Sequence, residues 1–128
     1  ESLKINRMFV CLKSSTKPQL DKNPRCSEED LNQAVNTTDK LLVIHTDPGC
    51  PNCPPFMSVI EEMFSERPDV VYAELSSRFQ SCDKLAQKLS LTGTPTVVFY
   101  NHGREAGRYS PVNRSEQELK TDLLKLVS

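Results

Sequence analysis

The chain has 128 residues, of which 37% are hydrophobic and 26% are charged. This size and balance fit one globular domain and exclude a disordered chain, a collagen-like chain and a coiled coil. Sixteen basic residues against seventeen acidic ones give a net charge of -1, so we expect neither nucleic acid nor an anionic membrane surface as a partner. The longest apolar runs are far shorter than the roughly 20 residues that a membrane-spanning helix needs.

Hydrophobic periodicity and turn residues predict how the first half of the chain folds. A short strand is expected over residues 8–12, followed by a polar, proline-containing loop over residues 13–25. Ser27 precedes three acidic residues, as an N-cap precedes the first turn of a helix, and the helix would bury Leu31. Residues 41–46 are nearly all apolar, which is typical of a strand covered on both faces.

The second half predicts further strands and helices. The clearest helix spans residues 56–67 and is stopped by Pro68, and a shorter helix is expected over residues 82–89. The expected strands are residues 70–75, 96–100 and 106–109. The last two strands flank the turn Asn101-His102-Gly103 and should pair as a hairpin.

The end of the chain completes the predicted fold. Ser115 and Glu118 have the spacing of a capping box, which predicts a final helix with Leu119 and Leu123 on its buried face. Strands and helices alternate early, and a hairpin followed by a helix closes the chain. We therefore expect one α/β domain over residues 1–128, with a central mixed β-sheet flanked by helices on both faces.

The strongest chemical signal is the motif Cys50-Pro51-Asn52-Cys53, which follows the strand at residues 41–46. At or just before a helix start, unpaired N–H groups and the positive end of the helix dipole stabilise a thiolate, so the pKa of Cys50 should fall below its usual value of about 8.5. Two intervening residues bring the second sulfur within bonding reach. We expect Cys50 to attack a disulfide and Cys53 to resolve the resulting mixed disulfide.

A zinc site is the main alternative for two cysteines at this spacing. It needs two more ligands, but the other cysteines stand alone and the two histidines are far apart, so we favour redox chemistry and expect no metal and no cofactor. Cys11, Cys26 and Cys82 fit buried apolar side chains, a structural bridge or regulatory thiols, and the sequence does not choose. A Cys11–Cys26 bridge has no support in the sequence. His45, inside an apolar strand, suits a structural role.

A proline opens the strand at residues 96–100, in the string Leu91-Thr92-Gly93-Thr94-Pro95-Thr96-Val97-Val98. With the two-cysteine motif 45 residues earlier, this string resembles the thioredoxin family, whose motif faces a cis-proline at the head of a strand. The resemblance implies a thioredoxin fold. It covers residues 41–128 well, while residues 1–40 fit only as a first strand, loop and helix of unusual sequence.

The resemblance also implies where a substrate binds. The bond between Thr94 and Pro95 would be cis and would lie beside the sulfurs, turning the Thr94 backbone outward to pair with an extended chain that lies across Cys50. Residues next to the first sulfur would complete the site. The substrate-binding residues expected in this way are Pro48, Gly49, Pro51, Asn52, Thr94 and Pro95.

Two departures from the family pattern bear on the mechanism. Pro48-Gly49 stands where the family has a tryptophan before the nucleophile, and the chain contains no Trp. Ile44 stands where thioredoxins bury an acid beneath the second cysteine. We hypothesise that Glu74, on the neighbouring strand, is buried with a raised pKa and accepts the proton of Cys53. The alternative places Glu74 in solvent near a strand end.

These features predict a monomeric thiol–disulfide oxidoreductase that exchanges disulfides with proteins. Its partners would be protein disulfide or dithiol substrates and a reductase or oxidase that supplies or removes electrons. In the alternative, the chain is a non-enzymatic binding module that keeps the fold's peptide groove and holds Cys50 and Cys53 as a fixed disulfide. The missing start methionine and the extra cysteines favour an extracytoplasmic or secretory setting over the cytoplasm.

Overall fold

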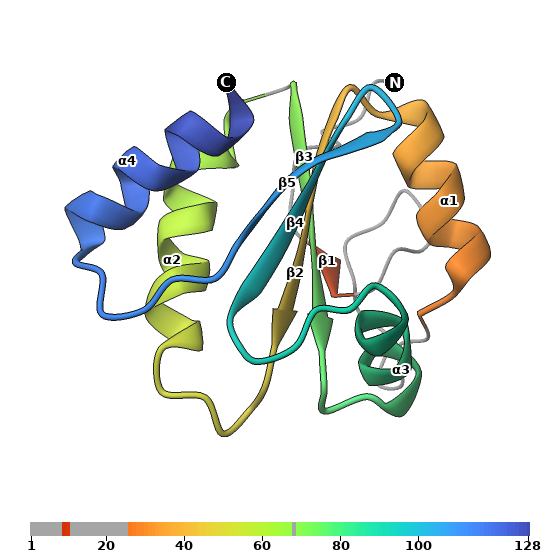
Figure 1. Cartoon of the computed structure of the whole chain (residues 1–128), viewed down its shortest axis with the longest axis horizontal. Helices are drawn as coiled ribbons and strands as arrows, with labels where there is room; N and C mark the ends of the chain where they lie inside the picture. The colour runs from red at the N-terminus through yellow and green to blue at the C-terminus, as the bar shows by residue number, and fades with distance from the viewer. Residues whose placement is uncertain (1–8, 11–25, 68) are drawn as a thin grey trace.

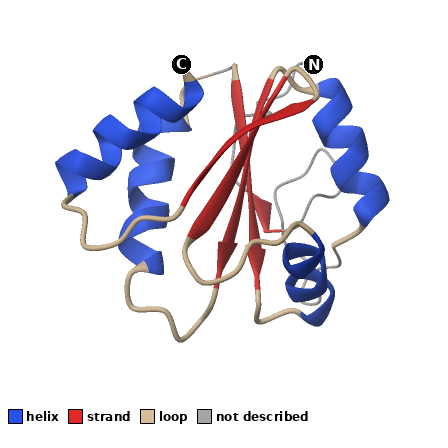
Figure 2. Cartoon of the chain, viewed as in Figure 1, coloured by secondary structure: helices blue, strands red, loops and turns tan. Residues whose placement is uncertain are grey.

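The computed structural model describes residues 9–10, 26–67 and 69–128. Within these ranges, one central sheet lies between two layers of helices, with α1 and α3 on one face and α2 and α4 on the other (Figure 1). Colouring by secondary structure shows the same three layers (Figure 2). The elements in chain order are β1 (Phe9–Val10), α1 (Glu28–Thr37), β2 (Lys40–Thr46), α2 (Cys53–Phe64), β3 (Val70–Ser76), α3 (Gln80–Lys88), β4 (Thr96–Asn101), β5 (Arg104–Tyr109) and α4 (Glu116–Val127).

The sheet is mixed, as predicted, and its strand order is β1-β3-β2-β4-β5. β1 and β2 each run parallel to β3, whereas β4 is antiparallel to both β2 and β5. The central strand β2 therefore ends beside the end of β3, where Thr46 faces Ser76, and beside the start of β4, where His45 faces Thr96. Three chain segments that are far apart in sequence meet at this edge of the sheet.

Alternation along the strands divides the core into two halves, because successive side chains point to opposite faces. On one face, strand residues pack with Leu31 of α1 and with Leu85 of α3. On the other face, strand residues pack with Phe56 of α2 and with Leu123 of α4. Buried aliphatic side chains build most of the first half, and the second half adds buried aromatic side chains to aliphatic ones. Both layers of helices are therefore anchored to the sheet by hydrophobic burial.

The predicted element types are confirmed over the described residues, while several bounds differ. β1 confirms the centre of the first predicted strand; the rest of that strand and the loop at residues 13–25 lie outside the described residues. The strongest helix begins at Cys53 and ends at Phe64, about three residues earlier at each end than predicted. Ser65 and Glu66 form a turn after it instead of continuing the helix to Arg67. α3 starts two residues earlier than expected, at Gln80.

The predicted hairpin between β4 and β5 is confirmed. His102 and Gly103 occupy its turn with φ angles of 53° and 85°, the left-handed values that a tight hairpin turn requires. β5 begins at Arg104, two residues earlier than predicted, because its first residues pair with β4 across an irregularity between Phe99 and Tyr100.

The predicted capping box is also confirmed and gives a test of local stability. The Ser115 hydroxyl accepts a hydrogen bond from the N–H of Glu118, and the Glu118 carboxylate accepts one from the N–H of Ser115. Replacing Ser115 by Ala should lower the free energy of unfolding by about 1 kcal/mol in urea titrations, because it leaves a helix donor without its cap. Ser110→Ala, at an exposed serine of the same connection, is the matched control; equal losses in both variants would contradict the prediction.

Candidate active site

The Cys50–Cys53 motif lies in the turn between β2 and α2. The two sulfurs form a disulfide, and their Cα atoms are 5.4 Å apart, inside the usual range for such a bond. Cys50 is half-buried in the turn, whereas Cys53 is the first residue of α2 and its side chain is only 4% exposed. The geometry thus makes the first sulfur the accessible one and the second the shielded one.

The start of α2 explains how this turn is held. Pro54 and Pro55 occupy the first helical turn, where their lack of an N–H group costs nothing. The Cys53 N–H donates to the Cys50 carbonyl, and the Phe56 N–H donates to the carbonyl of Asn52. Unpaired N–H groups were predicted at the helix start. In the structure the two prolines have no N–H group, and the N–H groups of Cys53 and Phe56 are hydrogen-bonded to backbone carbonyls. The first turn holds no acidic residue, so no side chain of that turn opposes the positive end of the helix dipole.

The bond between Thr94 and Pro95 is cis, as the family resemblance implied. Pro95 is buried and directly precedes β4, whose start pairs with the end of β2. The hydroxyl of Thr96 donates to the carbonyl oxygens of Thr92 (3.1 Å) and Gly93 (2.8 Å) and fixes the loop before the proline. The topology therefore brings Pro95 to the edge of the sheet from which the cysteine motif extends.

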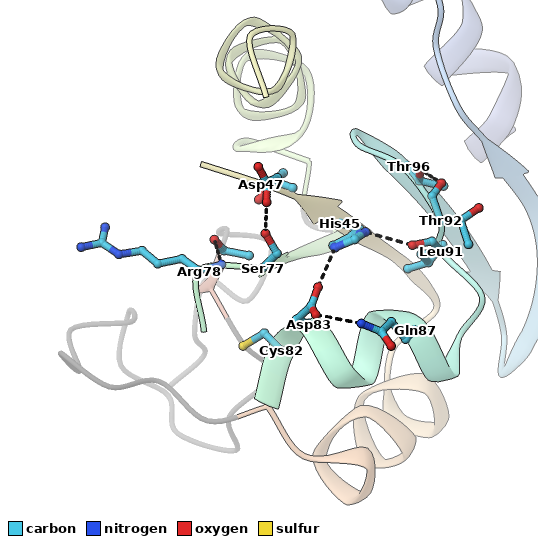
Figure 3. A network of polar contacts seen from close by, with 12 residues as sticks. His45, Asp47, Ser77, Arg78, Cys82, Asp83, Gln87, Leu91, Thr92 and Thr96 are labelled. Carbon is cyan, nitrogen blue, oxygen red and sulfur yellow. Dashed lines mark hydrogen bonds and ion pairs between the residues drawn. The ribbon is translucent and has the colours of Figure 1, made fainter. Parts of the chain in front are cut away.

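His45 has the structural role that the sequence favoured. It is 7% exposed, and its Nδ1 atom lies 2.9 Å from the carbonyl oxygen of Leu91 (Figure 3). A carbonyl only accepts, so Nδ1 carries a proton and donates it. The other ring nitrogen, Nε2, lies 3.6 Å from a carboxylate oxygen of Asp83 in α3. His45 thus ties the strand that leads to Cys50 to the loop that leads to Pro95.

A groove of about 390 Å³ opens between the starts of α2 and α4, beside the motif. Its apolar surface comes from Phe56, Val59 and Leu119, and three prolines lie around it: Pro55, Pro95 and Pro111. Asn52, from the motif, contributes to the polar rim together with Asn113 and Arg114 of the β5–α4 connection. No motif in the sequence marked the residues of this connection as part of the site. Their position between the hairpin and the last helix could have indicated them, because this connection leads from the sheet to the helix layer that contains α2.

Glu74 lies on β3 and faces the α2 side of the sheet, since its neighbours Val70 and Tyr72 pack into that half of the core. It is half-buried, and its carboxylate accepts a hydrogen bond of 2.6 Å from the hydroxyl of Thr46. Glu74 is paired in register with Ile44, the position where the family acid would stand. Its role in proton transfer stays a prediction.

The other predicted substrate-binding residues lie around Cys50. Pro48, Gly49, Pro51 and Asn52 are all exposed in the turn, and Thr94 is half-buried beside the cis bond. Their exposure leaves this edge of the molecule open to a visiting chain, and contact between these residues and a substrate stays a prediction.

A second disulfide joins Cys26 to Cys82, with 4.8 Å between the Cα atoms and a sequence separation of 56. The sequence left three alternatives open for Cys26 and Cys82: buried apolar side chains, a structural bridge or regulatory thiols. The structure shows a bridge between them. It links the residue before the α1 cap to α3, and Cys82 is 0% exposed. Because Cys26 pairs with Cys82, it is not bridged to Cys11, which lies outside the described residues.

Nowhere in residues 26–67 and 69–128 do three or more His, Cys, Asp or Glu side chains gather in a way that could hold a metal ion. In the same ranges, every helix is too short or too polar to cross a bilayer.

A mixed sheet between helix layers, with a two-cysteine motif at a helix start and a cis-proline at the head of the neighbouring strand, defines the thioredoxin-fold class. Comparison with known families agrees, since the thioredoxin-like domain matches residues 27–121. The chain therefore belongs to the thioredoxin-like family.

Two relatives show distant similarity in sequence. The chain is 34% identical over 57 residues to a thioredoxin of Methanocaldococcus jannaschii, a match that covers 44% of this chain and 66% of the relative. It is 26% identical over 94 residues to a protein named thioredoxin H10 of Arabidopsis thaliana, covering 73% of this chain and 60% of the relative. The chain thus spans less than two thirds of the length of these relatives.

Structural similarity covers more of the chain. A mutant thioredoxin from Halobacterium salinarum superposes with a TM-score of 0.71 at 16% identity, over 100% of this chain and 97% of the other. At this identity the match establishes the fold. Family membership and a cysteine pair that forms a disulfide together support a role of the thiol–disulfide oxidoreductase type.

Proposed function

We propose that this protein exchanges disulfides with protein substrates, with Cys50 as the nucleophile and Cys53 as the resolving thiol. The asymmetry of the pair supports this assignment most directly. Cys50 is half-buried in an exposed turn, whereas Cys53 is buried at the start of α2. A substrate can reach the first sulfur, while the second is positioned to attack only after a mixed disulfide has formed on its neighbour.

In the reducing direction, the Cys50 thiolate attacks one sulfur of a substrate disulfide. The substrate S–S bond breaks, a mixed disulfide forms on Cys50, and the released substrate thiolate takes up a proton. Cys53 then loses its proton and attacks the Cys50 sulfur, which breaks the mixed disulfide and releases the second substrate thiol. The substrate gains two electrons and two protons, and the protein ends with its Cys50–Cys53 disulfide, which a partner dithiol reductase must reduce. The reverse sequence oxidises a substrate dithiol.

The groove beside the motif supports a polypeptide as the substrate. Asn52 and Pro95 both border it, so a chain that brings a disulfide to Cys50 can extend a neighbouring side chain into the groove. The apolar surface, with its buried residues Phe56 and Val59, suits an aliphatic or aromatic side chain. In this proposal, the outward-facing backbone of Thr94 pairs with the substrate main chain.

Assay of the wild-type protein tests the proposal. Under mild dithiothreitol, two thiols per Cys50–Cys53 pair should become available to iodoacetamide, as counted by mass spectrometry. With dithiothreitol as the terminal reductant, the protein should accelerate the reduction of insulin above the uncatalysed rate. A pair that resists mild reduction, or a rate equal to that of dithiothreitol alone, would overturn the proposal and favour the binding module with a fixed disulfide.

Glu74 is proposed as the group that takes the proton from Cys53. It lies on the α2 face of the sheet, its position replaces the missing acid at Ile44, and its hydrogen bond to Thr46 fixes the carboxylate. Glu74→Gln should slow the resolving step about 100-fold in rapid-mixing experiments, because general bases contribute roughly that much or more. Glu61→Gln, an exposed acid on α2, is the matched control. An unchanged resolving rate in Glu74→Gln would remove this role.

The second disulfide supports an oxidising compartment as the site of action. Structural disulfides form and persist outside the reducing cytosol, and the Cys26–Cys82 bridge includes a fully buried cysteine. The extracytoplasmic or secretory setting favoured by the sequence is therefore part of the proposal. Rapid alkylation of the protein in its native cells should find Cys26 and Cys82 oxidised, and free thiols at both positions would contradict it.

A further inference from the structure

Asp47, the residue after β2, connects the turn that carries Cys50 to the loop after β3. One of its carboxylate oxygens accepts a hydrogen bond of 2.8 Å from the N–H of Gly49. The other accepts a short hydrogen bond from the hydroxyl of Ser77, and Figure 3 shows the two side chains pointing toward each other. The carbonyl oxygen of Asp47 accepts from the N–H of Cys50 at 3.0 Å. Asp47 therefore accepts hydrogen bonds from the backbone N–H groups of both Gly49 and Cys50.

The turn is closely fitted to this carboxylate. A Cβ atom added at Gly49 would lie 3.2 Å from the carboxylate oxygen of Asp47, which is tighter than ordinary van der Waals contact. A residue with a Cβ atom at this position would require the Asp47 carboxylate to shift by a few tenths of an ångström. The glycine at this position and the aspartate two residues earlier thus form one unit.

The carboxylate carries a negative charge in the neutral range. Hydrogen bonds from Ser77 and from the Gly49 N–H, together with the nearby His45, hold the pKa of Asp47 below its usual value, although burial acts in the opposite direction. The charge is hydrogen-bonded to the peptide group that joins Pro48 to Gly49, the residue before Cys50.

We propose that Asp47 is a positioning residue for Cys50 and that its charge disfavours the Cys50 thiolate in the reduced protein. An ionised neighbour raises the free energy of the thiolate, and a less stable thiolate makes the dithiol a stronger reductant, just as a stabilised thiolate makes an oxidant. Asp47 would therefore oppose the helix dipole of α2 and shift the pair toward a reducing role. This inference rests on the proposed redox function of Cys50 and Cys53.

The acidic side chains on the other elements that meet at this turn have partners elsewhere in the described residues. The first turn of α2 holds no acidic residue. On β3, Glu74 faces the α2 side of the sheet and is engaged by Thr46. On β2, His45 lies two residues before Asp47 and faces Asp83 of α3.

Asp47→Asn tests the charge alone, because the amide can accept from Gly49 and donate to Ser77 with the same shape. In the reduced variant, the pKa of Cys50 should fall, measured from the pH dependence of alkylation and of thiolate absorbance. The equilibrium constant against dithiothreitol at pH 8 should move about fivefold toward the dithiol, because a unit charge near the thiolate acts on it through a solvent-exposed, high-dielectric turn. Ser77→Ala keeps the charge and should not lower the pKa of Cys50.

Asp39→Asn is the matched control, since Asp39 precedes the opposite end of β2 and its replacement changes the net charge equally. Asp47→Ala removes both side-chain hydrogen bonds and should lower kcat/KM for insulin reduction, with Asp47→Asn restoring part of it. Wild-type values for both the pKa and the equilibrium in Asp47→Asn, or an equal shift in Asp39→Asn, would overturn the inference while leaving the proposed function intact. A wild-type pair that cannot be reduced would overturn both.

Discussion

Replacing Cys50 by serine is expected to abolish disulfide turnover, leaving insulin reduction at the rate of dithiothreitol alone. A serine hydroxyl is not ionised near neutral pH and does not form a bond to a disulfide sulfur, so the first step has no nucleophile. Cys53 should not substitute for Cys50, because its side chain is buried at the start of α2. The loss is therefore expected to be complete rather than partial.

Cys53→Ser should give a different result from the same assay. The accessible sulfur of Cys50 remains and attacks the substrate, but the mixed disulfide cannot be resolved within the protein. A covalent adduct with insulin should accumulate on non-reducing gels and disappear with excess dithiol. Cys50→Ser should form no such adduct.

A variant that lacks the second disulfide is the matched control, because it loses cysteines outside the Cys50–Cys53 motif. Cys26→Ser with Cys82→Ala keeps the Cys50–Cys53 pair and should retain two-step turnover at a temperature where it is folded. Turnover in Cys50→Ser, or an adduct that forms through Cys82, would contradict the assignment of Cys50 as the nucleophile.

Much of the fold was predictable because its signals are local. The Ser115 and Glu118 capping box, the turn at Gly103 and the apolar run that became β2 each depend on a few neighbouring residues. The cis bond before Pro95 came from a resemblance rather than from the physics of the sequence. The start of the strongest helix was predicted three residues too late, because the apolar periodicity begins at Phe56 whereas the helix begins at Cys53 with two prolines in its first turn.

The features of the site that the sequence did not predict all depend on contacts between distant segments. Asp47 meets Ser77 across 30 residues, and Cys26 meets Cys82 across 56. Neither pairing has a signature in neighbouring residues. The contact between Asp47 and Ser77 follows from strand order, because β3 lies beside β2 and the loop after β3 therefore lies next to the motif. Cysteine pairing in particular could not be deduced from spacing.

The same topology separates the two disulfides by function. Cys50–Cys53 closes a short turn at the edge of the sheet, where β2 ends and β4 begins. Cys26–Cys82 lies on the side of the sheet that α1 and α3 cover, in contact with that half of the core. The first bond joins cysteines separated by only 3 residues, whereas the second joins the segment before α1 to α3. Removing each should therefore affect different properties of the molecule.

Removing the Cys26–Cys82 bridge is expected to destabilise the protein by about 4 kcal/mol, the chain-entropy estimate for a loop of this length. The bridge closes a loop with a sequence separation of 56, so the unfolded chain gains much conformational freedom when it is absent. For a domain of this size, the loss corresponds to a fall in Tm of about 15 °C. Cys26→Ser with Cys82→Ala is the suitable variant, since an alanine avoids an unpaired hydroxyl at the fully buried position 82. Calorimetry and urea titration of the oxidised proteins measure the effect.

Cys50→Ser with Cys53→Ser provides the comparison, because it removes a disulfide whose cysteines are separated by only 3 residues. Its loop is so short that the same estimate gives less than about 2 kcal/mol, and the Tm should fall much less. Mild dithiol acts on the accessible pair first, so wild-type protein treated in this way should keep most of its stability until the buried bridge is reduced. Equal losses in the two double variants, or a Tm unchanged by removal of Cys26–Cys82, would show that the bridge does not stabilise the helix layer formed by α1 and α3.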